Sequence, residues 1–153
     1  MTAVEVGHVV AIAQEVFTAL VDGEEGLLVP DVTAGDLDGA VHAWVDIRGG
    51  VPLRPVVSVG REGADEIARS LMRLGSGEAV SQEDLVDALG EVANVIGGNV
   101  KSLVACPEGL TLPQVSVGGG PAGGVLLWRA PLQWRGHRLA ISMWSLERKD
   151  VAL

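Results

Sequence analysis

The sequence SQEDLVDALGEVANVIGGNVKSLV, from Ser81 to Val104, has the periodicity of one long amphipathic helix. Ser81 suits the N-cap position, and Asp84 follows three residues later at the position of a capping box, so we expect the helix to begin here. Apolar side chains then recur three or four residues apart, which predicts one buried face. They are Leu85, Leu89, Val92, Ile96, Val100 and Leu103, with Val86, Ala93 and Val104 widening the stripe.

The opposite face of this helix carries polar and small residues at the same spacing. They are Asp84, Asp87, Glu91, Asn94, Gly98 and Lys101. Glu91 and Asn94 lie one turn apart and therefore point in the same direction. Gly97 and Gly98 follow, although each glycine inside a helix costs about 1 kcal/mol relative to alanine. Because such a cost is more usual where another backbone or a partner approaches closely, we interpret this face as a contact surface.

The run EVANVIGGNVK, residues 91–101, resembles the long-helix motif of the CheX branch of the CheC/CheX/FliY phosphatases, which dephosphorylate the chemotaxis response regulator CheY. That family's signature is a Glu and an Asn separated by two residues, followed by an apolar pair and Gly-Asn. The likeness extends over most of the chain, since a first helix, a strand pair, a Leu-Pro-x-Val strand start at 112–115 and closing strands also match. The resemblance implies a single CheX-like domain over residues 1–153.

The resemblance also implies a reaction, the hydrolysis of the aspartyl phosphate on a CheY-like response regulator. This phosphate is a reactive anhydride, and the receiver supplies Mg²⁺ and a lysine around it, so we expect no cofactor in this chain. The helper protein has to place one water in line with the phosphorus. The Asn94 amide can both accept from and donate to that water, and Glu91 docks on the receiver lysine, which is the role that the family assigns to this Glu.

Other functions stay open at this point. A catalytically inactive CheX-like module would recognise a receiver or another partner through the same acidic stripe, and a general dimerisation domain is a third reading. On an arbitrary helix, Glu91 and Asn94 would simply be solvated. The resemblance further implies a homodimer in which sheets join. Three tryptophans on the closing strands would suit that interface, although strand tryptophans lie more often in a core or at its rim: Trp128, Trp134 and Trp144.

Composition and charge argue against several classes of protein. The chain has 11 Lys plus Arg against 20 Asp plus Glu, a formal net charge of −9, and no basic cluster, so neither nucleic acid nor an anionic membrane surface is an expected partner. No apolar run reaches the roughly 18 to 20 residues of a membrane span. The single cysteine, Cys106, which we interpret as a small apolar filler, allows no intrachain disulfide. Together with a first segment unlike a signal peptide, this predicts a cytoplasmic protein.

The remaining segments predict helices and strands. Residues 4–21 have helical spacing and, because Thr18 follows Glu15, carry no second Glu-x-x-Asn pair. Residues 40–47 and 53–59 alternate as a hairpin, whose second strand contains Pro55 and is therefore placed at an edge or a bulge. Further along we expect a short helix over 62–74 closed by Gly75, a strand over 110–117 and a last hairpin over 125–134 and 138–143.

Consecutive strands with short connections favour a largely antiparallel sheet. We therefore expect an α+β fold, a two-layer sandwich with helices on one face of the sheet, including one long central helix.

Other chemical motifs are weak. The glycine-rich segment 118–124 lacks the Lys-Ser/Thr of a phosphate loop and precedes a strand. The acidic segment 31–38 lacks the spacing of a calcium loop, the histidines at 8, 42 and 137 have no zinc-site spacing, and no nucleophile elbow occurs. We interpret Asn99 as structural, in a buried or helix–helix polar contact.

Overall fold

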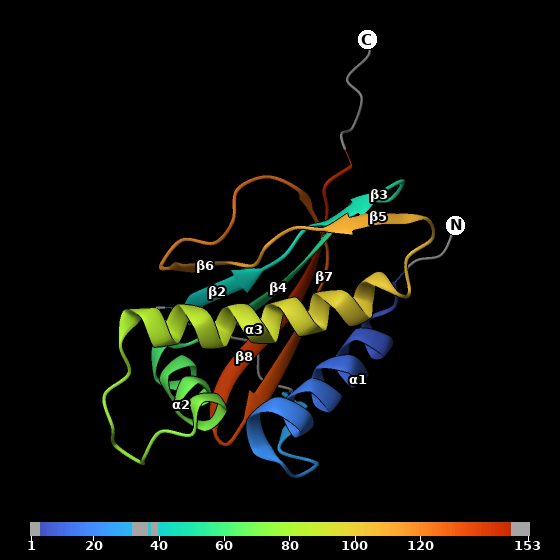
Figure 1. Ribbon diagram of the computed structural model, residues 1–153. Helices are drawn as coiled ribbons and strands as arrows, with labels where there is room; N and C mark the ends of the chain where they lie inside the picture. Colours follow the sequence, from blue (N-terminus) through green and yellow to red (C-terminus); the bar gives the residue numbers. More distant parts are fainter. Residues whose placement is uncertain (1–3, 32–36, 38–39, 148–153) are drawn as a thin grey trace.

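The computed structural model describes residues 4–31, 37 and 40–147, and in them three helices cover one face of a large antiparallel sheet (Figure 1). The helices are α1 (Val6–Val16), which continues as a π-helix η1 (Phe17–Asp22), α2 (Arg61–Met72) and α3 (Gln82–Lys101). This arrangement confirms the α+β two-layer class with one long helix lying across the sheet.

Within the described residues the sheet has eight strands, and its path runs in the order β1-β7-β8-β4-β2-β6, with β3 and β5 off this path. The strands are β1 (Leu28–Pro30), β2 (Val41–Trp44), β3 (Ile47–Gly49), β4 (Leu53–Val59), β5 (Pro107–Leu110), β6 (Gln114–Val117), β7 (Val125–Trp134) and β8 (His137–Ser145). Every strand pair recorded in this part of the chain is antiparallel. β1 and β6 therefore form the two edges of the main path.

Helix α3 begins where the sequence predicts, because the Ser81 hydroxyl accepts a hydrogen bond from the Asp84 backbone N–H at 3.0 Å. It ends at Lys101, earlier than the stripe through Leu103 and Val104 implied. Leu103 is consequently 37% exposed, and Val86, at the margin of the buried face, is exposed to the same extent. The central positions of the stripe are fully buried, as predicted: Leu85, Leu89, Val92, Ile96 and Val100.

The core lies between α3 and the inner face of the sheet and extends under α1. Trp134 of β7 is fully buried there and meets the Phe17 ring edge-on, with the ring centroids 5.9 Å apart. Its indole N–H donates to both carboxylate oxygens of Asp22 at 3.0 Å. Trp134 is thus a core residue and is not available at a subunit interface, whereas Trp128 and Trp144 are half-buried.

Strand β4 is central, not at an edge as its prolines suggested, because it pairs with β8 on one side and with β2 and β3 on the other. The β2 ladder stops at Trp44 opposite Val56, and pairing with β3 resumes at Ile47 opposite Leu53. Pro55 falls in this interruption, so no residue of β2 or β3 pairs with it, while on the other side it lies opposite Met143 of β8. A proline is therefore tolerated inside the sheet at this position.

The predicted strand over 110–117 is two strands. β5 pairs with β3 and β6 pairs with β2, so the break between them faces the break between β2 and β3. Reciprocal hydrogen bonds bridge the two breaks, since the Asp46 N–H donates to the Thr111 hydroxyl and the Thr111 N–H donates to the Asp46 carbonyl, both at 2.9 Å. The chain thereby keeps its register across a gap in the ladder.

Two local predictions need correction, and a third is confirmed. Helix α2 closes at Arg73, which adopts a left-handed conformation with φ 58°, before Gly75 is reached. Cys106 is exposed, also at positive φ, and fills no core space. The last hairpin is present, and its two-residue turn uses positive φ at Arg135 and Gly136, as type I′ turns do. Of the acidic segment 31–38, residues 32–36 and 38 lie outside the described part.

Candidate active site on helix α3

Glu91 and Asn94 lie on α3 at the side of the helix that does not face the core. Glu91 is exposed and Asn94 is half-buried. Because α3 runs uninterrupted from Gln82 to Lys101, the two side chains leave the same face one turn apart. This is the placement that the sequence predicted for the pair.

Both side chains border a shallow hollow on the surface. Its lining consists of Val86, Asp87, Gly90, Glu91, Asn94 and Pro113. Pro113 comes from the segment that connects β5 to β6, so one wall of the hollow is supplied from outside the helix. The hollow is open to solvent, which suits contact with a second macromolecule better than enclosure of a small ligand.

Gly90 allows the wall of the hollow to approach the helix. A side chain begun at Gly90 would have its Cβ 3.6 Å from Pro113 Cβ and Cγ, so the proline ring already lies in contact with the helix here. Gly90 is not among the site residues predicted from the sequence. The available signal was a glycine in the middle of a well-formed helix, directly before Glu91, and this cost in helix propensity indicates a close approach.

The Glu91 and Asn94 side chains are free to interact with a partner, as neither makes a hydrogen bond or ion pair within the described residues. Asn99 differs, because its amide N–H donates to the Val95 carbonyl of the same helix at 2.8 Å. Asn99 is also exposed, which contradicts the expected buried or helix–helix contact. An asparagine five residues from Asn94 points elsewhere and satisfies the backbone of its own helix.

The two adjacent glycines have different surroundings. Gly97 is buried against the sheet, and a Cβ at this position would overlap with the Val45 side chain. Gly97 therefore serves helix–sheet packing, and the interpretation of it as part of an outward contact surface is wrong. Gly98 is exposed with nothing within 4 Å of its Cβ position, so it leaves a flat patch on the outward side.

The outward side of α3 is acidic around the hollow. Asp87 and Glu91 are exposed, Asp84 is half-buried in the first turn, and Lys101 stands at the far end of the helix. Acidic residues near its N-terminus also interact favourably with the helix dipole. The charge pattern favours a partner that brings a cationic group to the hollow.

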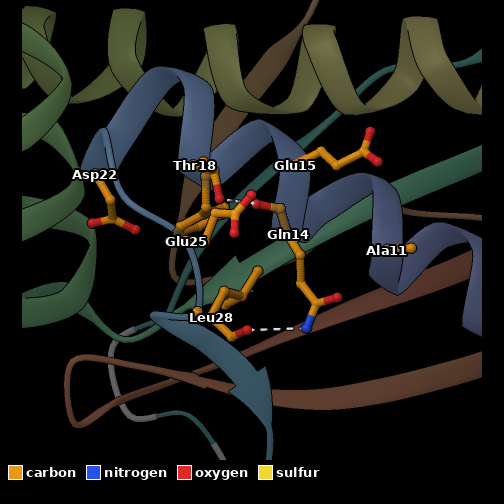
Figure 2. A pocket seen from close by; sticks show the side chains of 9 residues that line it. Ala11, Gln14, Glu15, Thr18, Asp22, Glu25 and Leu28 are labelled. Carbon is orange, nitrogen blue, oxygen red and sulfur yellow. Dashed lines mark hydrogen bonds between the residues drawn. The ribbon is translucent and has the colours of Figure 1, made fainter.

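A second hollow lies beside α1, between that helix and β1 (Figure 2). Glu15 and Thr18 border it, which are the residues at Glu-x-x-Asn spacing in the first helix. The Thr18 hydroxyl donates to the Gln14 carbonyl at 2.9 Å, and the Gln14 amide donates to the Leu28 carbonyl at 3.1 Å. Thr18 offers no amide, and its hydroxyl is engaged by the helix backbone, so this hollow does not repeat the pair on α3.

Other kinds of site are not evident in the part of the chain that the structure describes. In residues 4–31, 37 and 40–147, no three or more His, Cys, Asp or Glu side chains gather where they could hold a metal ion. The same residues include no helix with the length and apolar character needed to cross a membrane.

The structure thus combines a helical layer on an antiparallel sheet with a Glu-x-x-Asn pair on the outward side of its long helix. The chain matches the family described as "Chemotaxis phosphatase CheX" over residues 41–122, more than half of its length and including all of α3. The chain belongs to this CheX family. A search among curated protein sequences found no match.

Solved structures share the fold across nearly the whole chain. The chemotaxis protein CheX from Vibrio vulnificus superposes with a TM-score of 0.72 at 18% identity, covering 95% of this chain and 99% of that one. A chain of the CheX-CheY-BeF3-Mg complex from Borrelia burgdorferi gives 0.71 at 18% identity, covering 95% and 100%. FliY from Thermotoga maritima gives 0.63 at 17% identity, covering 90% and 84%. At these identities the likeness shows the fold alone.

Proposed function

We propose that this protein is a phosphatase that hydrolyses the aspartyl phosphate of a CheY-like response regulator. The observation that carries the proposal is the Glu91–Asn94 pair, presented one turn apart on a helix that is packed on the sheet, with both side chains free and a hollow beside them. Membership of the CheX family of chemotaxis phosphatases supports it. So does the Borrelia burgdorferi CheX, which was solved in complex with CheY, BeF3 and Mg.

In this proposal Asn94 orients the attacking water. Its amide oxygen accepts a hydrogen bond from the water, while its N–H group donates one to the water or to a phosphoryl oxygen. The water oxygen forms a bond to phosphorus, and the bond between phosphorus and the aspartyl oxygen breaks, so the products are inorganic phosphate and the free carboxylate. The contribution of Asn94 is positioning and electrostatic stabilisation, which are the principal catalytic terms in phosphoryl transfer.

In the same proposal Glu91 helps to position the receiver on helix α3. Its exposed carboxylate, one turn before Asn94, pairs with the active-site lysine of the receiver and thereby sets the depth and angle at which the helix enters. Mg²⁺ is expected on the receiver, where it neutralises the phosphoryl oxygens, and this chain brings no cofactor of its own. The half-buried position of Asn94, in the hollow that Gly90 and Pro113 also line, supports this division of roles, because it limits the orientations of the amide.

We further propose that residues 1–153 form a single domain and that the protein is cytoplasmic. We also propose a homodimer formed along β7. β1 pairs with β7 only from Leu132 to Trp134, so the first half of β7 has β8 as its one partner among the described strands. That half carries three consecutive exposed apolar residues, Val125, Leu126 and Leu127, which are 50%, 46% and 52% exposed. An apolar strand edge that is unpaired on one side favours strand pairing with another chain.

The direct experiment follows phosphate loss from a phosphorylated receiver. The CheY-like receivers of the source organism are phosphorylated with acetyl phosphate, and their decay is compared with and without the protein. Faster decay of one receiver supports the phosphatase. Binding to a receiver with unchanged decay in every mixture would overturn the enzyme and leave a catalytically inactive binding module of the same fold.

A further inference from the structure

Leu112 is the most exposed large apolar side chain in the described part of the chain, at 85%. It lies in the short connection between β5 and β6, directly before Pro113. A single exposed leucine is ordinary on a protein surface. The position of Leu112 and the way its backbone is held distinguish it.

The backbone on both sides of Leu112 is fixed. Thr111 exchanges two hydrogen bonds of 2.9 Å with Asp46, one through its N–H and one through its hydroxyl. Asp46 is itself held by a bidentate pair with Arg54, at 2.6 and 3.0 Å. Pro113 packs on α3 and restricts the backbone of the residue before it. The leucine is thus presented to solvent from a segment with little backbone freedom.

This segment runs beside the turns of α3 that carry the proposed active site. Leu110 contacts the helix at Gly97, where its Cδ1 lies 3.6 Å from the Cβ position, and Pro113 contacts it at Gly90 at the same distance. Asn94 lies between these two contact points on the helix, and Leu112 lies between Leu110 and Pro113 on the segment. Leu112 is therefore the chain neighbour of Pro113, which lines the hollow together with Glu91 and Asn94.

Val86 adds a second apolar residue to the same surface. It lines the hollow at the end nearer the helix N-terminus and is 37% exposed. The carboxylates of Asp87 and Glu91, both exposed, border the same hollow. Apolar anchors beside charged groups that set orientation are the arrangement expected of a transient protein–protein interface.

We infer that Leu112, together with Val86, forms the apolar part of the receiver-docking surface, and that the receiver presents an apolar patch beside the cationic group that Glu91 meets. This inference rests on the proposed function, because it takes the phosphorylated receiver as the occupant. Charge complementarity and continuity with the hollow favour that partner over a second copy of this acidic chain. Since the backbone on both sides of the leucine is already held before binding, its burial requires little ordering of the backbone.

The test separates docking from chemistry. Leu112→Ser is compared with Leu112→Met, which keeps an apolar side chain, and with Leu103→Ser, a partly exposed leucine beyond the other end of α3. Thermal unfolding verifies that all three variants fold. For the receiver that the wild type dephosphorylates, we expect Leu112→Ser to raise KM roughly tenfold to a hundredfold, from the lost burial of one leucine, with kcat within about twofold. The other two variants should stay near the wild type.

The outcomes distinguish this inference from the proposed function. If the wild type is active and Leu112→Ser has an unchanged KM, or loses kcat alone, the docking role is overturned and the phosphatase stands. If the wild type does not accelerate decay, the phosphatase fails, and docking is read from the affinity for the beryllofluoride-loaded receivers. A higher Kd for Leu112→Ser than for the wild type then supports the inference. An equal Kd for the two proteins, or no binding by the wild type, overturns it.

Discussion

Gly97 of α3 packs directly against Val45, so closely that a Cβ on the glycine would overlap with the valine side chain. Val45 follows β2 and is fully buried on the inner face of the sheet. The contact brings the middle of α3 close to the sheet, while Gly90 gives a second close approach at Pro113. These two contacts fix the height at which Glu91 and Asn94 are carried above the sheet.

Replacing Gly97 by alanine should destabilise the protein. The added methyl group overpacks the interface with the stiff Val45 side chain, and overpacking typically costs about 1–3 kcal/mol, which exceeds the gain of about 1 kcal/mol in helix propensity. Urea unfolding at fixed pH measures the change. The matched control is Gly98→Ala, which meets nothing within 4 Å and should gain stability. Equal stabilisation by both substitutions would show that α3 does not approach the sheet this closely.

Asp22 should stabilise the fold through Trp134. Its carboxylate is 1% exposed, accepts from the Trp134 indole N–H and lies 3.1 Å from the Arg135 guanidinium. Asp22→Ala leaves the indole N–H buried without an acceptor, and we expect a loss of about 1–3 kcal/mol in the free energy of unfolding. Glu25→Ala, at an exposed position on the same side of the molecule, should change it by less than about 0.5 kcal/mol. A loss at Asp22 no larger than at Glu25 would contradict the role given to this bond.

Much of α3 can be predicted from the sequence, because its determinants are local. The Ser81 cap and the spacing of Leu85, Leu89 and Ile96 fix the start and the buried face, and the outward direction of Glu91 and Asn94 then follows from helix geometry. The family resemblance adds the chemistry. These predictions required no knowledge of distant contacts.

The wall of the site could not be predicted in the same way. Pro113 meets Gly90 only because β6 pairs with β2 and passes beside α3. The glycine signals a close approach, but nothing local identifies Pro113 as the residue that approaches. The central position of β4 could not be predicted for a similar reason. Pro55 is tolerated there because the partner strand changes from β2 to β3 beside it, and the sequence around Pro55 does not show that change. Cys106 likewise carries no local signal of its exposure. For the wall of the site and for β4, the physical cause is a partner far away in the sequence.

Charge reversal at Glu91 should weaken association with the receiver. Glu91→Lys would face the receiver lysine with a like charge, and we expect KM to rise at least about tenfold, the effect of 1.4 kcal/mol. Glu108→Lys makes the same change in net charge at an exposed residue of β5 and is the control. Stopped-flow measurement over a range of receiver concentrations separates KM from kcat. The docking role of Glu91 is lost if the two variants behave alike.

The dimer along β7 predicts a specific monomerising substitution. Leu127→Lys places a charge in the middle of the apolar edge, which would have to lose its hydration on strand pairing. Sedimentation velocity should show a dimer for the wild type and a monomer for this variant, whereas Leu103→Lys should remain dimeric. A wild type that sediments as a monomer at every concentration would refute the pairing.

The most direct measurement is single-turnover phosphate loss from the phosphorylated receiver, at saturating protein, for the wild type and Asn94→Ala. Removing one positioned polar group commonly costs on the order of 10²–10³ in rate, so we predict a fall of that size with the affinity for the receiver retained. Asn99→Ala, which removes an amide bonded to its own helix, should keep the wild-type rate. A wild-type rate in Asn94→Ala would contradict the central claim that this amide positions the attacking water.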